Sequence, residues 1–430
     1  MFRFAPSPTG DMHIGNLRVA LFNFIVSSQK NEKFIIRIED TDKVRNIEGK
    51  DREILEILAL FDIKYQNVSY QSANIKFHRQ LATQLLSDGN AFICFCSDEL
   101  LDEKREEAKK QKKAYKYDGT CEGLSDRAVM ENEESSFTVR IKKPLEDLTF
   151  FDKIKGSVSF GAKEIDSFVI LRKDKTPTYN YACAVDDMLS NIGFVIRGED
   201  HLSNTPKQEH IRKLFKYDEK MEFAHLPIIL NIEGKKMSKR DDASSVKWLL
   251  EQGFLPQAIT NYLILHGNKT PKKIFSLDEA LDWFDIEKIS KNPAKFDINQ
   301  LRDLNNAHIN LMDSLKLSTL IGYSSADIGE LAKLYTEEAS TINELKPKID
   351  KVFRAKVSDD ENVAKLRSVM SDTPYFEEFN EFKKYLMVNS GLKGKNFFQP
   401  LRFLLTGANS GPKLQDVYPL IKNYLTEIIK

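Results

Sequence analysis

The N-terminal part of the chain contains Pro6-Ser7-Pro8-Thr9-Gly10-Asp11-Met12-His13-Ile14-Gly15-Asn16, a turn-rich segment between two apolar stretches. The stretch before it, Met1–Ala5, predicts a short strand, and apolar residues recur at helical spacing from Ile14 to Gln29. A second strand is expected at Phe34–Ile38 and a second helix at Glu53–Leu60. Strand, helix, strand and helix in this order predict an α/β fold with a parallel sheet.

Composition narrows the class of protein. The chain has 430 residues, a length that typically holds about three domains. Lys plus Arg and Asp plus Glu each number 64, so the formal net charge is zero, which excludes a histone-like protein that coats nucleic acid by bulk attraction. Hydrophobic residues make up 41% and charged residues 30%, the balance of a globular chain. Four cysteines, no signal-peptide pattern and no long apolar run predict a soluble cytoplasmic protein without a membrane span.

The pattern changes along the chain. Residues 97–114 are dense in charge and predict a solvated helix, and strand-like pieces follow at 137–141, 158–160 and 168–171. A strand at 194–197 resumes the α/β pattern, and helical patterns dominate from residue 245 onward. We therefore expect an α/β core, an inserted α+β block and an all-helical C-terminal region. The expected segments are 1–88, 89–172, 173–240, 241–304 and 305–430.

Two segments carry residue types that bind phosphate. His13 and Gly15 stand where a strand gives way to a helix, and backbone N–H groups and the helix dipole favour an anion there. Gly15 would let a flat base lie against the backbone, and His13 would donate to phosphate oxygens. Further on, residues 235–240 place four cations on one loop, enough to neutralise a triphosphate. Each segment alone also fits a helix-capping turn or a solvated basic loop, but their combination favours nucleotide binding.

These segments match known signatures. His13-Ile14-Gly15-Asn16 resembles the HIGH signature of class I aminoacyl-tRNA synthetases, and Lys236-Met237-Ser238-Lys239-Arg240 resembles their KMSKS signature. Further segments resemble bacterial glutamyl-tRNA synthetases: Arg3–Gly10, Arg37–Asp42, Val195–His201, Gly253–Pro256, Asn261–Leu263, Gly394-Lys395, Gln399–Arg402 and Leu405–Gly407. The resemblance runs nearly the whole chain, densely in the first 300 residues and thinly after them.

The resemblance implies a fold and a reaction. It implies a Rossmann-type catalytic domain in two halves, 1–88 and 173–240, split by an acceptor-stem-binding insertion at 89–172. A helical stem-contact region at 241–304 and a helical anticodon-binding domain at 305–430 would follow. In the implied reaction, L-glutamate attacks the α-phosphate of ATP to give glutamyl-adenylate and diphosphate, and the terminal ribose of tRNA(Glu) then takes the glutamyl group. ATP with Mg²⁺ is the implied cofactor, and a monomer is the implied state.

The resemblance also assigns roles to individual residues. It implies catalytic roles for His13, Lys236 and Lys239. It implies ATP contacts for Ser7, His13, Gly15, Asn16, Lys236, Met237 and Lys239. It implies glutamate contacts for Arg3, Ser7, Glu39, Tyr179 and Arg197.

The chemistry of glutamate agrees with this assignment. A planar guanidinium pairs bidentately with a carboxylate, so Arg3 and Arg197 suit the γ-carboxylate, and Glu39 would meet the α-ammonium. One position departs from the family pattern, because Cys183 stands where many relatives carry asparagine. A thiol is a poorer hydrogen-bonding partner than an amide, so this part of the implied contact set is altered.

The cysteines form another candidate site. Cys94 and Cys96 are too close in sequence for a comfortable disulfide, whereas metal-bound thiolates tolerate this spacing. The interval from Cys96 to Cys121 equals that of zinc-binding relatives, but Gly123 stands where those relatives carry histidine. Tyr117 precedes Cys121 in a Tyr-x-x-x-Cys arrangement, and the resemblance to a related short enzyme implies that such a tyrosine completes a structural zinc site. Three reduced thiols without a metal are the alternative.

The sequence also allows alternative functions. Some bacterial enzymes of this family also charge tRNA(Gln) for later amidation, or charge it alone. A shortened relative that glutamylates a tRNA base lacks a helical tail like residues 305–430, and glutaminyl-tRNA synthetases usually carry a β-barrel there. A catalytically inactive tRNA-binding paralogue is disfavoured because His13, Gly15, Lys236 and Lys239 are intact.

Overall fold

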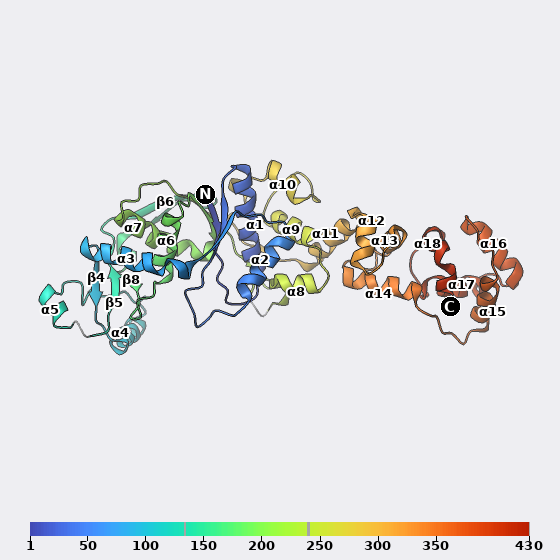
Figure 1. The fold of residues 1–430 in the computed structure, drawn as a ribbon, viewed down its shortest axis with the longest axis horizontal. Helices are drawn as coiled ribbons and strands as arrows, with labels where there is room; N and C mark the ends of the chain where they lie inside the picture. The colour runs from blue at the N-terminus through green and yellow to red at the C-terminus, as the bar shows by residue number, and fades with distance from the viewer. Residues whose placement is uncertain (133–134, 239–240, 430) are drawn as a thin grey trace. The chain divides into compact units, whose positions relative to one another are not determined.

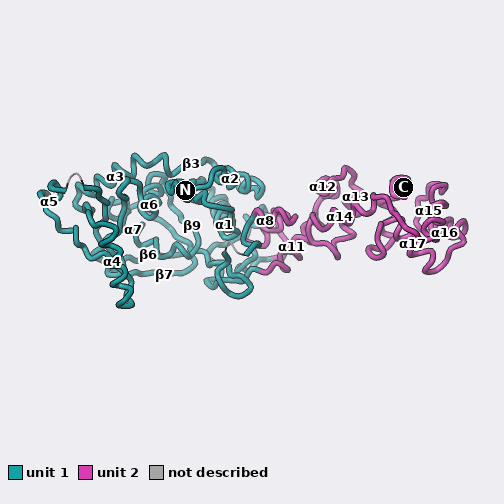
Figure 2. The backbone as a smooth tube through the Cα atoms, turned by 90° about the horizontal axis from the view of Figure 1, so that it is seen from below, with its two compact units in different colours: residues 1–246, 264–271, 277–296 teal, residues 247–263, 272–276, 297–430 magenta. Residues whose placement is uncertain are grey.

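The chain divides into two compact units in the computed structural model, which describes residues 1–132, 135–238 and 241–429 (Figures 1 and 2). Unit 1 comprises residues 1–246, 264–271 and 277–296, and unit 2 comprises residues 247–263, 272–276 and 297–430. Unit 1 holds the segments with α/β pattern, and unit 2 holds most of the region for which the sequence predicts helices.

A seven-stranded sheet runs through unit 1 in the order β3-β2-β1-β9-β10-β6-β7. Its strands are β1 (Phe2–Phe4), β2 (Phe34–Ile38), β3 (Asn67–Tyr70), β6 (Leu148–Asp152), β7 (Gly156–Phe160), β9 (Phe194–Gly198) and β10 (Glu222–Leu226). Neighbouring strands are parallel, except that β6 and β7 form an antiparallel hairpin. Every residue of β1 and β2 is buried, as in parallel sheets covered on both faces. The predicted α/β class is confirmed.

The N-terminal elements follow the predicted pattern closely. Helix α1 (Ile14–Gln29) and strand β2 have the predicted bounds, and α1 packs on β1, β2 and β9. Helix α2 (Lys50–Leu60) begins earlier than predicted, directly after Gly49, whose φ of 80° lets the chain turn into the helix. Because α1 starts where β1 has just ended, the turn of residues 6–13 lies at the carboxyl end of the sheet.

The segment expected as an insertion, 89–172, contributes to two sheets. Strands β4 (Ala91–Cys94), β5 (Thr138–Ile141) and β8 (Val169–Leu171) form a separate antiparallel sheet, with helices α4 (Asp98–Lys110) and α5 (Asp126–Met130) near it in Figure 1. The β6–β7 hairpin instead extends the seven-stranded sheet next to β10. Phe150 of the hairpin packs edge-on against Phe223 of β10, with 5.3 Å between ring centroids, so burial of aromatic surface favours this pairing.

Two helices and a short turn supply further residues of the site described below. Helix α6 (Tyr179–Leu189) and helix α7 (Thr205–Leu214) lie side by side, and the 3₁₀ turn η3 (Glu199–Asn204) joins β9 to α7 (Figure 1). Most of α6 is buried, including two consecutive carboxylates, Asp186 and Asp187. Buried carboxylates require partners, and these partners belong to the site described below.

Among the described residues from 298 to 429, helices are the only regular elements, so the helical prediction for the C-terminal region is confirmed there. The helices that lie wholly or mostly in unit 2 include α8 (Val246–Glu251), α9 (Pro256–Leu265), α11 (Ile298–Leu311), α12 (Ser314–Leu320), α13 (Ala326–Lys333), α14 (Ile342–Phe353), α15 (Glu361–Ser371), α16 (Phe379–Ser390), α17 (Lys395–Thr406), α18 (Leu414–Ile421) and α19 (Leu425–Ile428). Helix α17 ends at Gly407, whose φ is 67° and whose added Cβ would lie 2.4 Å from the Lys351 carbonyl oxygen. Only glycine fits this close approach of two helices.

Candidate active site

A cavity of about 400 Å³ opens at the carboxyl ends of β1, β9 and β10. Parallel sheets commonly bind ligands at this edge, because loops and helix N-termini converge there. The cavity wall includes ten of the residues that the sequence singles out: Arg3, Ser7, His13, Gly15, Asn16, Glu39, Tyr179, Arg197, Lys236 and Met237. Lys239 lies outside the described residues.

His13 caps the N-terminus of α1 at one end of the cavity. Its Nδ1 accepts a hydrogen bond of 3.0 Å from the Gly15 N–H, so the proton of the neutral ring sits on Nε2. That Nε2 is buried and makes no hydrogen bond within the described part of the chain. Burial and the charge of Lys236 lower the pKa of His13, which keeps the ring neutral. The arrangement offers an N–H donor beside a helix N-terminus, a suitable environment for a phosphate oxygen.

The loop that carries Lys236 lies on the same cavity. Its Nζ is 2.8 Å from Asp200 Oδ2, and both side chains are about half exposed. Met237, the next residue, is buried and donates its backbone N–H to Ile229. The buried methionine therefore anchors the loop while the lysine beside it keeps an exposed ammonium.

A buried network of charges includes the cavity-wall residues Arg3, Glu39 and Cys183. Arg3 binds Asp187 through Nε–Oδ1 and Nη2–Oδ2 contacts of 3.2 and 3.3 Å, and Arg37 Nη1 lies 2.6 Å from Asp187 Oδ1. Arg37 Nη2 also donates to Glu39 at 3.2 Å and to the Cys183 sulfur at 3.5 Å. Burial raises the pKa of Glu39, while the two arginines oppose the shift. Two guanidinium groups thus share the carboxylates, and the Arg3 side chain still faces the cavity.

Arg197 and Tyr179 complete the cavity wall. Arg197 is 5% exposed and donates to His225, Gln208 and Thr205. The hydroxyl of Tyr179, at the start of α6, lies 3.1 Å from His201 Nδ1. Burial lowers the pKa of His201 to about 4, so this imidazole is neutral at neutral pH.

The sequence does not predict the role of several residues in and around the site. The sequence alone assigns no role to Arg37, Asp187, His201 or His225, although Arg37 and His201 lie inside segments that resemble the family. One signal could have revealed Asp187, because two adjacent carboxylates in the otherwise apolar stretch 181–188 need buried cations. No comparable signal marks His225, because it lies in a short strand far along the chain from its partners.

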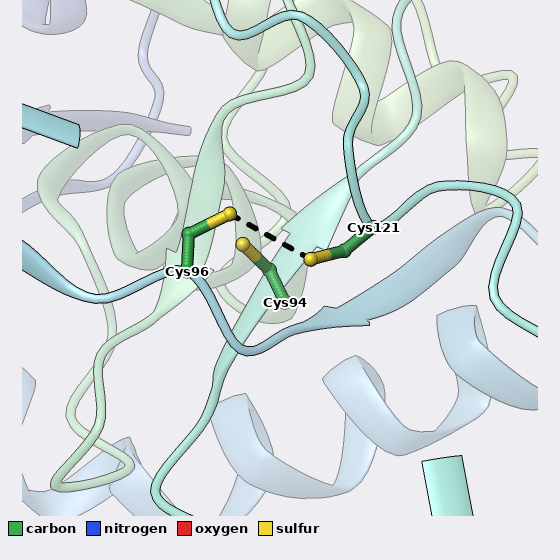
Figure 3. Close-up of side chains that lie close together, drawn as sticks. All are labelled: Cys94, Cys96 and Cys121. Carbon is green, nitrogen blue, oxygen red and sulfur yellow. Dashed lines mark hydrogen bonds between the residues drawn. The ribbon is translucent and has the colours of Figure 1, made fainter. Parts of the chain in front are cut away.

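The three cysteines of the candidate metal site do come together. The sulfur atoms of Cys94, Cys96 and Cys121 all lie within 4.8 Å of one another, and the side chains converge in Figure 3. The Tyr117 hydroxyl is 3.5 Å from the Cys94 sulfur and 3.6 Å from that of Cys96. Burial raises the pKa of Cys94, but its hydrogen bonds with Tyr117 and Arg140 bring that pKa down to about 7.

This donor set fits a zinc ion. Zinc prefers four ligands in a tetrahedron and binds thiolates well. Arg140 Nε lies 3.3 Å from the Cys94 sulfur, and its guanidinium stacks 3.8 Å from the Tyr117 ring centroid, so a positive charge stabilises the thiolate. An added Cβ at Gly123 would meet no atom within 4 Å, and this residue brings no ligand.

Comparison with known proteins agrees with this geometry. Residues 1–303 match the family model "tRNA synthetases class I (E and Q), catalytic domain", and residues 311–423 match "Anticodon binding domain". Glutamate–tRNA ligase 2 of Sulfurimonas denitrificans is 60% identical over 433 residues, and glutamate–tRNA ligase 1 of Nitratiruptor sp. is 59% identical over 434, each covering 100% of both chains. The crystal structure of a glutamate tRNA ligase from Elizabethkingia meningosepticum in complex with its amino acid is 27% identical, with a TM-score of 0.85, and covers 100% of this chain and 98% of that one.

The fold and the matched models define a class I aminoacyl-tRNA synthetase, with a catalytic and an anticodon-binding domain. Within that class, the chain belongs to the glutamate–tRNA ligase family.

Among the described residues, no helix is both long and apolar enough to span a membrane.

Proposed function

We propose that this chain attaches L-glutamate to tRNA(Glu) with ATP, through glutamyl-adenylate. Glutamate–tRNA ligation is the activity named for its full-length relatives. The observation that carries the proposal is the single cavity in which the helix-capping His13 and the buried arginines Arg3 and Arg197 all take part. An anion-binding end for a nucleotide and a cationic wall for a dicarboxylic amino acid suit the two substrates of the first step.

The nucleotide belongs at the α1 end of the cavity. His13 would donate from Nε2 to a phosphate oxygen, and Lys236 would neutralise charge on the diphosphate that leaves. The remaining contacts to ATP would come from Ser7, Gly15, Asn16 and Met237. The family motif also implies a contact from Lys239. The attacking glutamate carboxylate is already ionised at neutral pH, so positioning and cations do most of the work.

Mg²⁺ would arrive with ATP and supply charge neutralisation on its phosphates. Within the described residues, the only group of three or more potential metal ligands is the cysteine cluster, whose sulfur atoms do not suit Mg²⁺. The ion therefore has no preformed protein cage of carboxylates in the part of the chain that the structure describes.

Glutamate belongs at the arginine wall. Arg3 and Arg197 would bind the γ-carboxylate, with Tyr179 beside them, and Glu39 and Ser7 would face the α-amino group and the backbone of the amino acid. Arg3 and Arg197 line the cavity as buried guanidinium groups, so a carboxylate placed there would receive charge-assisted hydrogen bonds. A neutral glutamine side chain would lack the charge that strengthens those hydrogen bonds.

The remaining regions would contact tRNA or serve structure. Residues 89–172 would bind the acceptor stem, 241–304 the adjoining stem and 305–430 the anticodon. Residues 1–88 and 173–240 would form the catalytic domain, whose sheet the β6–β7 hairpin extends. Cys94, Cys96, Cys121 and Tyr117 would hold a structural zinc ion remote from the reaction, because three sulfurs and a hydroxyl converge there. The protein would act as a monomer in the cytoplasm, where tRNA is charged.

The test is glutamylation with ATP and labelled glutamate of purified tRNA(Glu) and tRNA(Gln) in separate reactions. Charging of tRNA(Glu) alone is the expected result. Charging of both tRNAs, or of tRNA(Gln) only, would place the protein at the start of an amidation route instead. A folded preparation that charges neither would overturn the proposal.

The same assay tests the glutamate site. Arg197→Ala is expected to raise the KM for glutamate by at least tenfold, because a charge-assisted pair is worth about 1.5–3 kcal/mol. The KM for ATP should change little, because Arg197 belongs to the arginine wall and ATP is proposed to bind at the α1 end of the cavity. Unchanged glutamate affinity in this variant would remove the proposed role of Arg197.

A further inference from the structure

Arg197 is held by three buried side chains, none of which the sequence singles out. Its Nε lies 3.1 Å from His225 Nε2, its Nη1 2.9 Å from Gln208 Oε1 and its Nη2 2.6 Å from Thr205 Oγ1. All four side chains are at most 5% exposed. A guanidinium carries five N–H donors, so these bonds leave one N–H on each terminal nitrogen. Arg197 lines the cavity, where that pair of donors matches a carboxylate.

The other nitrogen of His225 faces a buried carboxylate. His225 Nδ1 lies 2.6 Å from Asp152 Oδ2, and the same oxygen accepts the His225 backbone N–H at 3.0 Å. The second oxygen, Oδ1, accepts the backbone N–H groups of Ile154 and Lys155 at 2.9 and 2.8 Å. Asp152 is fully buried and is fixed by the turn between β6 and β7.

These contacts allow only one tautomer of the His225 ring. The carboxylate of Asp152 can only accept, so Nδ1 must carry the proton. Nε2 is then an acceptor, which is what the Nε–H of Arg197 and the hydroxyl of Thr205, 3.0 Å away, both require. A proton on Nε2 would face the Arg197 N–H donor-to-donor and leave Nδ1 against a carboxylate oxygen. Burial lowers the pKa of His225, in agreement with a neutral ring.

The sheet register brings the three residues together. Arg197 of β9 and His225 of β10 are direct partners in a parallel pairing, so their side chains project from the same face. Asp152 ends β6, the next strand, where it pairs with Phe223. A row of side chains therefore crosses three strands, from the hairpin to the cavity, although 73 residues separate Asp152 from His225.

We propose that Asp152 and His225 are positioning residues that orient Arg197 for the γ-carboxylate of glutamate. Asp152 fixes the tautomer of His225, His225 presents its lone pair to the Arg197 Nε–H, and one N–H on each terminal nitrogen of this cavity-lining residue stays free for the ligand. Without this acceptor the guanidinium loses one of its three fixed contacts, and a misaligned guanidinium loses bidentate pairing. The inference rests on the proposed role of Arg197 in glutamate binding.

A matched pair of variants of the full chain tests it. His225→Asn places an amide nitrogen near the position of Nδ1, which keeps the contact with Asp152 but offers nothing to Arg197. His225→Gln extends an amide oxygen to the position of Nε2, which restores an acceptor for the Nε–H. Aminoacylation kinetics are measured for both, for the parent and for Arg197→Ala, with glutamate and ATP varied separately.

The expected result is a rise of roughly tenfold in the glutamate KM of His225→Asn, with a smaller rise in His225→Gln and little change in the KM for ATP. An unaltered glutamate KM in His225→Asn, beside a raised one in Arg197→Ala, would overturn the positioning role and leave the glutamate site standing. An unaltered value in Arg197→Ala itself would instead overturn the proposed function. If kcat falls and both KM values rise to the same extent in the two His225 variants, the role of His225 is only structural. That result would also overturn the inference.

Nitrogen NMR of histidine-labelled protein gives an independent readout. The structure predicts a protonated Nδ1 and an unprotonated Nε2 for His225, and the signal is assigned by its loss in His225→Gln. A protonated Nε2, or a ring protonated at both nitrogens at neutral pH, would contradict the hydrogen-bond directions on which the inference depends.

Discussion

The guanidinium of Arg3 and the carboxylate of Asp187 make two parallel contacts of 3.2 and 3.3 Å, with both side chains almost fully buried beside the cavity. Arg3 belongs to the first strand of the chain, and Asp187 lies 184 residues later on α6. The pair fixes one edge of the Arg3 guanidinium, so that only the other donors remain for a ligand. Arg37 bonds to the same carboxylate, so Asp187 holds two arginines at once.

Replacing Asp187 by asparagine removes the charge that holds both arginines. We expect Asp187→Asn to lower the free energy of unfolding by about 3–5 kcal/mol, because it leaves buried cations uncompensated. The KM for glutamate should also rise by roughly tenfold, because Arg3 loses its orientation. Thermal unfolding and aminoacylation kinetics measure the two effects.

Asp186→Asn is the matched control for this prediction. Asp186 is equally buried, but it bonds to Gln71, Asn74 and His78 and not to Arg3. It should lower stability without a selective effect on glutamate. If both variants raise the glutamate KM equally, the orientation of Arg3 by Asp187 is not the cause.

Removal of the Lys236 ammonium should slow the reaction of ATP with glutamate. We expect Lys236→Ala to lower the rate of adenylate formation by 10- to 100-fold, because one charge-assisted contact to phosphate is lost. The KM for glutamate should stay near the parent value, since Lys236 pairs with Asp200 rather than with the arginine wall. Single-turnover formation of glutamyl-adenylate in the presence of tRNA measures this, and a normal rate would exclude Lys236 from the first step.

Zinc content tests the cysteine cluster. Protein expressed with added zinc should contain close to one zinc ion per chain, and Cys121→Ser should lose most of it because only two thiolates remain. Cys183→Ser is the control, since Cys183 is buried elsewhere, against Arg37. Elemental mass spectrometry gives the metal count, and a zinc-free parent protein would contradict the proposed site.

The burial of Lys356 in unit 2 predicts an unusual pH dependence of folding stability. This lysine is 4% exposed and donates to the carbonyls of Val352 and Ile428 at 2.5 and 2.6 Å. Burial lowers its pKa from 10.5 to about 8. Between these two pH values the unfolded chain keeps the proton that the folded chain has released, so stability increases with pH there.

The comparison with Lys356→Met isolates this contribution. From pH 8 to pH 10.5 the parent should gain about 3 kcal/mol of unfolding free energy relative to the variant, because each pKa unit is worth 1.36 kcal/mol. Urea unfolding of both chains across this range measures the difference. A constant difference would mean that the folded-state pKa of Lys356 is close to its ordinary value.

The sequence predicted the elements whose pattern is strong and local. The bounds of α1 and β2 follow from uninterrupted apolar periodicity, and the helical C-terminal region follows from the same signal repeated many times. Strands β6 and β10 were not predicted. They are only five residues long and include charged or polar residues that find partners across the sheet, as Asp152 and His225 do.

The candidate site shows the same division. Sequence motifs alone selected ten residues that the fold gathers around one cavity. They did not select Arg37, Asp187, Asp152 or His225, because no motif spacing marks a residue that acts by holding another side chain. These residues matter only after two distant strands or helices are packed together.

The chain by itself thus determines its α/β and helical regions, its two nucleotide motifs and the identity of the charged groups that its reaction requires, since each is written in local composition and spacing. Tertiary structure decides how those groups are oriented: Asp187 aligns Arg3, and Asp152 and His225 align Arg197. The reason is physical. A buried charge is tolerated only with a partner, and the partner that satisfies it lies wherever the packed sheet and helices bring one within hydrogen-bonding distance.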